Sequence, residues 1–171
     1  VAQGHLSQSD LDKLRVALGK TASLAKLLSV ALSAIRELHE ETGLVIGRPI
    51  VDIAAGGPFA SLSLAPFITP LRIIARAVTP PVYPRRFDTH FFAAFRDKAV
   101  HEPSSLLSSS GELLDLDWFT LDEAKSLDLP QITQVILEEV ETRLSLDPAL
   151  EGDLPIPCYI MRRGQMRRKM Y

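Results

Sequence analysis

One sequence feature restricts the possible folds more than any other. It is a long apolar stretch with helical periodicity that ends in a cluster of charged residues. Between residues 24 and 42, apolar side chains recur every three or four positions. These positions are Leu24, Leu27, Leu28, Ala31, Ile35 and Leu38. The spacing predicts an amphipathic α-helix. Gly43 is expected to end it, because glycine readily adopts the left-handed conformation found at helix C-termini. The chain must therefore bury one face of this helix.

The composition fits a single globular domain over residues 1–171. Of these residues, 46% are hydrophobic and 23% are charged, which is enough apolar surface for a sizeable core. The net charge of −2 argues against a general attraction to nucleic acid or membranes. The longest mostly apolar run, residues 22–35, contains Lys26 and is too short to span a bilayer. With no signal-peptide pattern and the single cysteine Cys158, we expect a cytoplasmic protein.

Helical patterns lie on both sides of a region rich in strand patterns. Ser9 and Asp10 are expected to cap a first helix from Leu11. Thr120 is expected to cap a short helix, and Pro130 to open a longer one that ends near residue 146. The apolar stretch and these segments predict an α/β protein.

Three segments have the composition or alternation of strands, and the segments around them have that of loops. The expected strands are 71–78, 87–95 and 112–119. We expect the second to be buried on much of both faces. Residues 47–70 contain three glycines and four prolines, which predicts a loop with one short helix near 58–64. Residues 79–86 are expected to form a stiff, proline-rich connection, and residues 101–111 a flexible loop.

Three glutamates occupy the last two turns of the predicted helix 24–42. Glu37, Glu40 and Glu41 have the spacing i, i+3 and i+4, so they share one face, roughly opposite the apolar stripe. Each like-charged pair costs about 0.2–0.5 kcal/mol of helix stability. A hard divalent cation would remove that repulsion, because carboxylate oxygens are ligands that Mg²⁺ prefers. Arg36 could orient one glutamate. The alternative is a solvated acidic helix end, which this spacing alone favours.

The string R-E-L-H-E-E-T-G-L resembles the second half of the Nudix box. That half reads Arg-Glu-hydrophobic-x-Glu-Glu-x-Gly-hydrophobic, and the matching residues are Arg36, Glu37, Leu38, Glu40, Glu41, Gly43 and Leu44. The first half does not match: Leu28 stands where the box has glutamate, and Ala22 where it has glycine.

The chain also resembles the Nudix branch of peroxisomal coenzyme A diphosphatases and their bacterial relatives. In that branch a long insertion separates the glycine-rich loop from the helix, and residues 1–35 resemble this insertion plus the helix start. The resemblance continues over 76–92, 112–133 and 154–165. The family's first strands and its F-P-G-G loop are absent, so we expect these elements to be encoded upstream of Val1.

The resemblance implies a Nudix-type α/β/α sandwich, with a mixed sheet between helix 24–42 and helix 130–146. It implies Mg²⁺- or Mn²⁺-dependent hydrolysis of a nucleoside-diphosphate-linked substrate, with coenzyme A or acyl-coenzyme A as the leading candidate. Metal ligation would fall to Glu37, Glu40 and Glu41, with Arg36 orienting them. The base would be Glu37 or Glu112.

Arginines near the expected cleft are candidates for substrate binding. Arg76, Arg85 and Arg86 flank two predicted strands, and a guanidinium matches phosphate oxygens with two parallel hydrogen bonds. The alternative is a structural ion pair with Asp88. A basic run between Arg162 and Lys169 is either a solvated end or a phosphate or dimer contact, so a homodimer is possible.

His39, His90 and Cys158 are predicted to be structural. His39 is expected to be exposed at a variable motif position, His90 to be a satisfied strand histidine, and Cys158 to be buried packing. Two other functions stay open. One is a Nudix-fold nucleotide-binding or regulatory module without hydrolysis, which would not need three repelling carboxylates. The other is a helical interaction protein with a basic tail, against which the strand patterns count.

Overall fold

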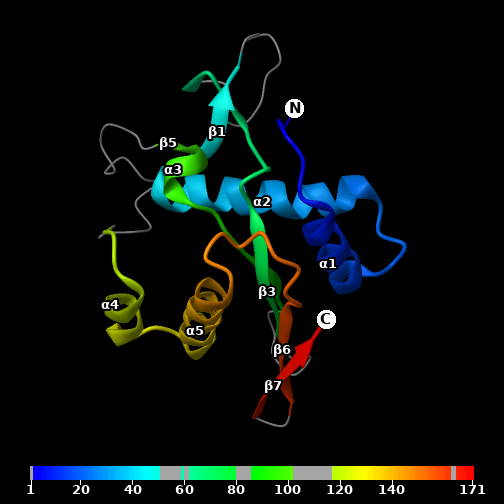
Figure 1. The fold of residues 1–171 in the computed structure, drawn as a ribbon, viewed down its shortest axis with the longest axis vertical. Coiled ribbons are helices and arrows are strands. Elements are labelled where there is room, and N and C mark those ends of the chain that lie inside the picture. The colour runs from blue at the N-terminus through cyan, green and yellow to red at the C-terminus, as the bar shows by residue number, and fades with distance from the viewer. Residues whose placement is uncertain (1, 51–58, 60–61, 80–85, 102–116, 163–164) are drawn as a thin grey trace. The chain divides into compact units, whose positions relative to one another are not determined.

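The computed structural model describes residues 2–50, 59, 62–79, 86–101, 117–162 and 165–171 (Figure 1). The chain is mixed α/β, as the sequence predicts, and one of its sheets is mixed. Contacts divide it into two compact units. The first unit comprises Val1–Gln8, Ala22–Leu71 and Ala94–Asp117. The second unit comprises Ser9–Thr21, Arg72–Ala93 and Trp118–Tyr171.

The first unit is built on a long helix and a small antiparallel sheet. Helix α2 spans Leu24–Thr42 and packs on strand β1, Val45–Pro49. Strand β1 pairs with β2, Leu64–Pro66, and with β5, Val100–His101, so the strand order is β2-β1-β5. The short helix α3, Arg96–Ala99, also contacts β1.

Both ends of α2 are fixed by local hydrogen bonds. At the N-terminus, the Ser23 hydroxyl accepts a hydrogen bond from the Lys26 N–H at 3.3 Å, which satisfies a free donor of the first turn. At the C-terminus, Gly43 has φ of 74° and its N–H donates to the His39 carbonyl at 2.8 Å. The predicted glycine cap is therefore confirmed.

The buried stripe of α2 is narrower than its apolar pattern. Leu27, Ala31 and Ile35 are buried at four-residue spacing, as expected for one helix face. Leu24 was expected in this stripe, but its side chain is 53% exposed because it lies in the solvated first turn.

The second unit contains a four-stranded mixed sheet in the order β4-β3-β6-β7. Strands β3, Arg72–Val78, and β4, Asp88–Ala93, confirm two predicted strands. Strands β6, Pro157–Arg162, and β7, Gln165–Met170, form a hairpin from the apolar and basic parts of the tail. Among the described strands of this sheet, β3 and β6 pair in parallel and the other neighbours pair antiparallel.

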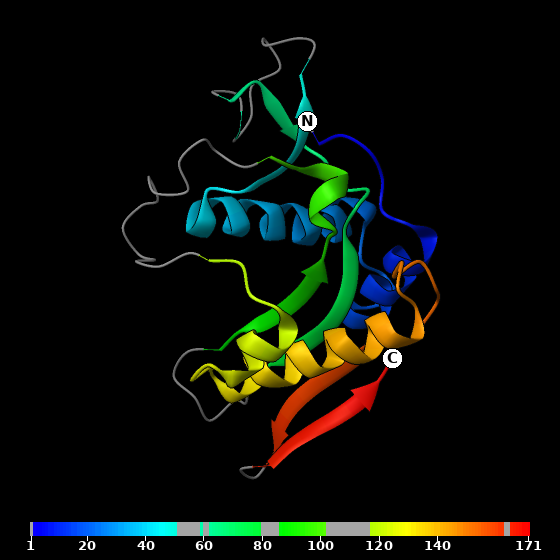
Figure 2. The same cartoon turned by 60° about the vertical axis from the view of Figure 1, so that its left-hand side comes forward.

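Three helices accompany this sheet: α1 (Gln8–Leu18), α4 (Leu121–Ser126) and α5 (Gln131–Leu146). Helix α5 lies across one face of the sheet (Figure 2), where Ile136 packs with Ala75 and Tyr159. The predicted start of α4 is confirmed by a capping box that joins Thr120 and Glu123. The predicted span of α5 is confirmed as well.

Asp10 is not the helix cap that its sequence context predicted. Helix α1 begins at Gln8, so Asp10 lies inside its first turn and is 2% exposed. Its carboxylate instead accepts a hydrogen bond from the Ile73 N–H at 3.0 Å, at the start of β3. Asp10 therefore links the first turn of α1 to the start of β3.

The predictions for 47–70 and 112–119 are wrong where the structure describes them. Strands β1 and β2 lie partly in the expected loop, because pairing between them overrides the glycine and proline content. Asp117, Trp118 and Phe119 are not in a strand, and the two aromatic side chains are 52% and 50% exposed. Residues 112–116, 80–85 and 102–111 lie outside the described residues, as do residues 58, 60 and 61 of the expected helix 58–64.

Strand β4 differs from its prediction in burial. Asp88 and Thr89 are exposed and the following residues are half-buried, so neither face is fully covered. None of the helices in the described segments combines the length and apolar character needed to cross a membrane.

Candidate functional site

The three glutamates of the motif lie on the last two turns of α2, in the first unit. We call residues 36–41 the acidic helix end. Glu37, Glu40 and Glu41 are all exposed, and the side chains of Glu37 and Glu40 are 53% and 57% exposed. The buried stripe of α2 keeps the helix in place while these carboxylates remain accessible to a ligand.

Arg36 contacts two of these glutamates. Its Nη2 donates to Glu37 Oε1 at 2.6 Å, and its Nε lies 3.5 Å from Glu40 Oε1. The hydrogen bond to Glu37, with the charge of Glu40, raises the pKa of the Arg36 guanidinium above its ordinary value. Arg36 therefore links adjacent turns of one helix face.

The three carboxylates are chemically suited to bind a hard divalent cation. Carboxylate oxygens at i, i+3 and i+4 are ligands of the kind that Mg²⁺ and Mn²⁺ accept. Among the residues that the structure describes, no three Asp, Glu, His or Cys side chains converge on one point. Because the glutamates are exposed, rotamer changes alone could redirect them toward an ion.

The turn after the helix is held by packing and hydrogen bonds. The His39 ring meets the Phe59 ring edge-on, with 4.9 Å between the ring centres, and its Nδ1 lies 3.2 Å from the Gly43 carbonyl. His39 is half-buried, so its expected exposure is wrong. The Thr42 hydroxyl donates to the Leu38 carbonyl and accepts from the Leu44 N–H. These contacts fix the connection between the acidic helix end and β1.

The candidate substrate-binding arginines lie in the second unit. Arg76 forms a two-pronged ion pair with Asp88, because Nε and Nη2 each lie 2.6 Å from one carboxylate oxygen. Hydrogen bonding across this pair raises the pKa of Arg76 and lowers that of Asp88. Arg76 thus takes the structural pairing that the sequence left as an alternative. Arg86 is exposed, while Arg85 and Glu112 lie outside the described residues.

Two predicted structural residues lie on the same sheet. Cys158 is a free, fully buried thiol, as expected. Hydrogen bonding to Cys158 raises the pKa of Tyr171. His90 was expected to be satisfied, but its buried Nε2 has no hydrogen-bond partner in the described part of the chain. Burial lowers the pKa of His90.

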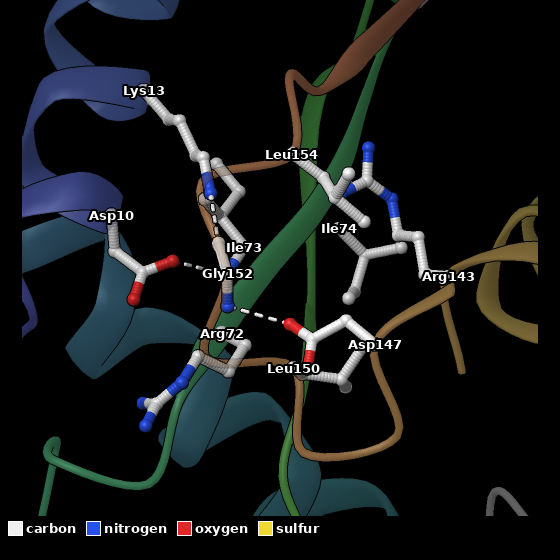
Figure 3. A pocket seen from close by; sticks show the side chains of 10 residues that line it. All are labelled: Asp10, Lys13, Arg72, Ile73, Ile74, Arg143, Asp147, Leu150, Gly152 and Leu154. Atoms are coloured by element: carbon white, nitrogen blue, oxygen red, sulfur yellow. Dashed lines mark hydrogen bonds between the residues drawn. The ribbon is translucent and has the colours of Figure 1, made fainter. Parts of the chain in front are cut away.

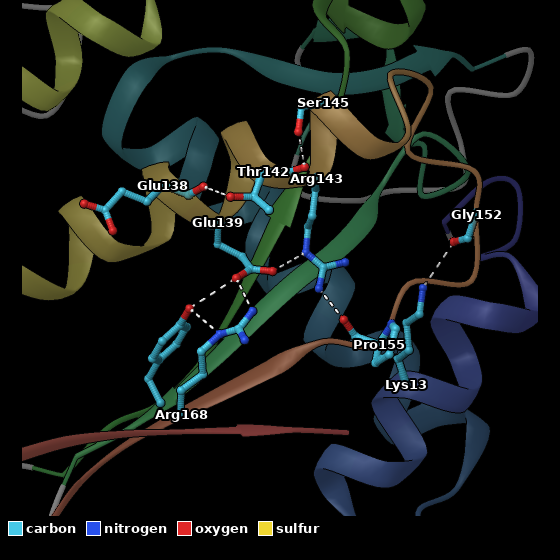
Figure 4. A network of polar contacts seen from close by, with 10 residues as sticks. Lys13, Glu138, Glu139, Thr142, Arg143, Ser145, Gly152, Pro155 and Arg168 are labelled. Carbon is cyan, nitrogen blue, oxygen red and sulfur yellow. Dashed lines mark hydrogen bonds and ion pairs between the residues drawn. The ribbon is translucent and has the colours of Figure 1, made fainter.

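A buried carboxylate on α5, Glu139, was not predicted from the sequence (Figure 4). Glu139 is 7% exposed and accepts hydrogen bonds from Arg143 at 2.9 Å, Arg168 at 2.9 Å and Tyr159 at 3.2 Å. Arg143 also donates to the Pro155 carbonyl. The i, i+4 spacing of Glu139 and Arg143 could have revealed the first pair. We call these four side chains, Glu139, Arg143, Tyr159 and Arg168, the buried network.

A small polar pocket in the second unit is lined by Asp10, Lys13, Arg72, Arg143 and Asp147, among others (Figure 3). Lys13 Nζ lies 3.5 Å from the Gly152 carbonyl and 3.8 Å from Asp153, and burial lowers its pKa. The interior has room for about one water molecule, which is too small for a nucleotide. We therefore interpret this pocket as a structural feature of the second unit and not as a substrate-binding site.

Comparison with known proteins adds no relative. No protein-family model matches the chain, and neither a curated protein nor a solved structure matches it.

Proposed function

We propose that this chain is a Nudix-type hydrolase that uses Mg²⁺ or Mn²⁺ to cleave a diphosphate linked to another group. The observation that carries the proposal is the contact of Arg36 with both Glu37 and Glu40 on an exposed helix end that Gly43 terminates. These residues belong to the half of the Nudix box that the sequence matches. Arg36 also reduces the repulsion among these carboxylates, which keeps them close together on one exposed helix end.

The four charged residues of the acidic helix end each have a role under this proposal. Glu37, Glu40 and Glu41 supply carboxylate oxygens to the cation, and Arg36 holds the first two in place. When bound, a divalent cation neutralises phosphate charge and lowers the pKa of the attacking water. Glu37 or Glu112 takes the proton from that water as it attacks phosphorus, and a phosphate ester leaves. Arg76, Arg85 and Arg86 are the proposed phosphate contacts.

The proposal extends to the fold, the cellular location and the substrate. The fold would be a Nudix α/β/α sandwich in a cytoplasmic protein, which could form a homodimer. Coenzyme A or acyl-coenzyme A would be the substrate, because the sequence resembles that branch over most of its length. Arg76 would bind phosphate only if it left Asp88, since both prongs of its guanidinium are occupied.

A nucleotide-binding module without hydrolysis is the second candidate. It is favoured by one observation, which is that no three potential metal ligands converge among the described residues. In such a module Arg36 would retain its ion pairs with Glu37 and Glu40 when the nucleotide binds, and the nucleotide would not be hydrolysed.

A substrate screen separates the two. Coenzyme A, an acyl-coenzyme A, a nucleotide sugar, a dinucleotide and an oxidised nucleoside triphosphate are incubated with this chain and with the full product of its gene. Release of phosphate esters is measured with and without Mg²⁺, and binding is measured by calorimetry. Mg²⁺-dependent release supports the hydrolase, and binding without release supports the module. If no compound binds or reacts, both candidates fail.

A further inference from the structure

The outer edge of the four-stranded sheet is a basic strand. The order β4-β3-β6-β7 places β7 at one end of the sheet, and Figure 1 shows it beside β6 alone. Every residue of β7 except Met166 is exposed. Arg167, Arg168 and Lys169 follow one another in this strand. Among the described strands, none pairs with the outer side of β7, so this edge combines outward-facing backbone groups with positive charge.

The register shows which backbone groups face outward. The Tyr171 N–H donates to the Ile156 carbonyl at 2.9 Å, so this pair is hydrogen-bonded. In an antiparallel ladder, hydrogen-bonded pairs alternate with pairs that make no such bonds. Arg167 and Lys169 therefore bond to β6 through their backbones. The N–H and C=O groups that point away from the sheet are those of Met166, Arg168 and Met170.

The side chains divide between the two faces. Arg168 reaches the α5 side, where it contacts Glu139 at 2.9 Å and Tyr159 at 3.3 Å. Because side chains alternate along a strand, Arg167 and Lys169 lie on the opposite face. Both are exposed; the Lys169 ammonium lies 5.3 Å from the Tyr171 ring centre. Two cations are therefore presented one strand repeat apart, next to free backbone groups.

We propose that the β7 edge binds an extended acidic segment of another protein, which adds to the sheet as a further strand. Backbone bonds to Met166, Arg168 and Met170 would give affinity, and acidic residues at alternate positions would face Arg167 and Lys169. A second copy of β7 fits poorly, because its own cations would meet like charges across the pair. Free backbone donors and acceptors at strand spacing favour a peptide over a nucleic acid. This inference does not depend on the proposed hydrolysis.

The test uses the full chain and a defined probe. A fluorescent eight-residue peptide that alternates glutamate with valine is titrated with protein, and its anisotropy is followed at low and high salt. A lysine–valine peptide of the same length is the charge control. We expect saturable binding of the glutamate peptide alone, and weaker binding at high salt, because exposed ion pairs are screened.

Three variants separate the contribution of charge from that of the backbone. Reversing both charges in Arg167→Glu/Lys169→Glu should weaken binding about ten-fold or more, since each exposed pair is worth up to about a factor of five and reversal adds repulsion. Met170→Pro removes an outward N–H without touching the ladder to β6, and should weaken binding. Met170→Ala keeps that N–H and should bind like the parent. Circular dichroism and melting curves check that each variant folds.

Several outcomes would overturn the proposal. Charged residues also protect sheet edges from pairing, and that role alone predicts that neither peptide binds. Equal binding of both peptides, or equal affinity in folded Met170→Pro and Met170→Ala, would exclude strand addition. Sedimentation that shows a dimer lost in the charge-reversed variant would assign the edge to a second copy instead.

Discussion

Two glutamate–arginine pairs on different helices differ mainly in burial. On α2, Arg36 lies 2.6 Å from Glu37, and their side chains are 54% and 53% exposed. On α5, Arg143 lies 2.9 Å from Glu139, and their side chains are 6% and 7% exposed. The contact distances are similar, but the dielectric surroundings are not. Exposed pairs are screened by water and contribute little to stability, whereas a buried charge that loses its partner is expensive.

The difference separates a group that can change partners from one that cannot. Water can solvate Glu37 and Glu40 when they leave Arg36, so under the proposed function a cation would replace Arg36 at little cost. Glu139 has three hydrogen-bond donors around it and joins α5 to both strands of the β6–β7 hairpin. We therefore expect substitutions in the acidic helix end to change activity, and substitutions in the buried network to change stability.

The largest effect is expected from Glu139→Ala. The change leaves the buried guanidinium of Arg143 without its counter-charge, and breaking a buried pair in this way costs about 3–5 kcal/mol. Urea unfolding followed by circular dichroism measures the loss. Glu138→Ala is the matched control, because it removes the neighbouring exposed glutamate from the same helix. The control should stay within about 0.5 kcal/mol of the parent. Equal midpoints for both variants would show that the buried network adds nothing.

The next effect is expected from Glu41→Gln, which keeps the shape of the side chain and removes its charge. If Glu41 helps to hold the cation, kcat/KM with Mg²⁺ should fall about 100-fold, which corresponds to about 2.7 kcal/mol of transition-state stabilisation. The melting temperature should not change, because Glu41 is exposed.

Glu138→Gln serves as the activity control for Glu41→Gln. It removes one exposed carboxylate from a helix of the second unit, so it matches the change in net charge. Full activity of Glu41→Gln on a substrate identified by the screen would exclude the metal role of this residue.

Sequence reasoning was most successful where a local signal determines the structure. Gly43, the Thr120 capping box and the span of α5 depend on residues within one or two turns. Strands β3 and β4 are confirmed because their composition is strongly apolar or β-branched. Arg36 was expected to orient one glutamate, and its i, i+4 spacing with Glu40 agrees with their contact. Its shorter contact, with the adjacent Glu37, does not follow from that spacing.

The predictions failed where contacts with residues distant in sequence determine the local structure. Asp10 has the sequence context of a cap, yet it is used by the N–H of Ile73, 63 positions away. Strand β1 carries a glycine and a proline, and becomes a strand through its pairing with β2. Arg168 looks like one cation of a solvated tail until its contact with Glu139 is known. Cation binding by the acidic helix end involves a partner outside the chain, so the amino-acid pattern alone does not determine it.

A smaller effect is expected from Arg36→Lys. Lysine keeps the positive charge but loses the planar fork that reaches two carboxylates at once. We expect activity to fall about ten-fold and more Mg²⁺ to be needed for half-maximal rate, because the glutamates are less well positioned. A purely structural Arg36 would lower the melting temperature and leave the Mg²⁺ requirement unchanged. That result would mean that the exposed Arg36–Glu37 pair, like the buried Arg143–Glu139 pair, serves stability and not activity.

The smallest expected effect is a pH dependence of stability from His90 in the second unit. Burial, with a smaller contribution from Arg76, lowers the pKa of His90 below its ordinary value near 6.5, and Asp88 opposes that shift only in part. Below pH 6.5 the unfolded chain then binds a proton that the folded chain resists, so the free energy of unfolding falls as the pH drops from 6.5 toward the folded pKa. His90→Gln cannot titrate, and its stability should depend less on pH between 8 and 5.5. Urea unfolding of the parent and the variant at both pH values measures this contribution, while His5→Gln, at an exposed site, controls for a general loss of histidine. The same slope in the parent and in His90→Gln would mean that His90 is hydrated in both states, and that its buried Nε2 has a partner after all.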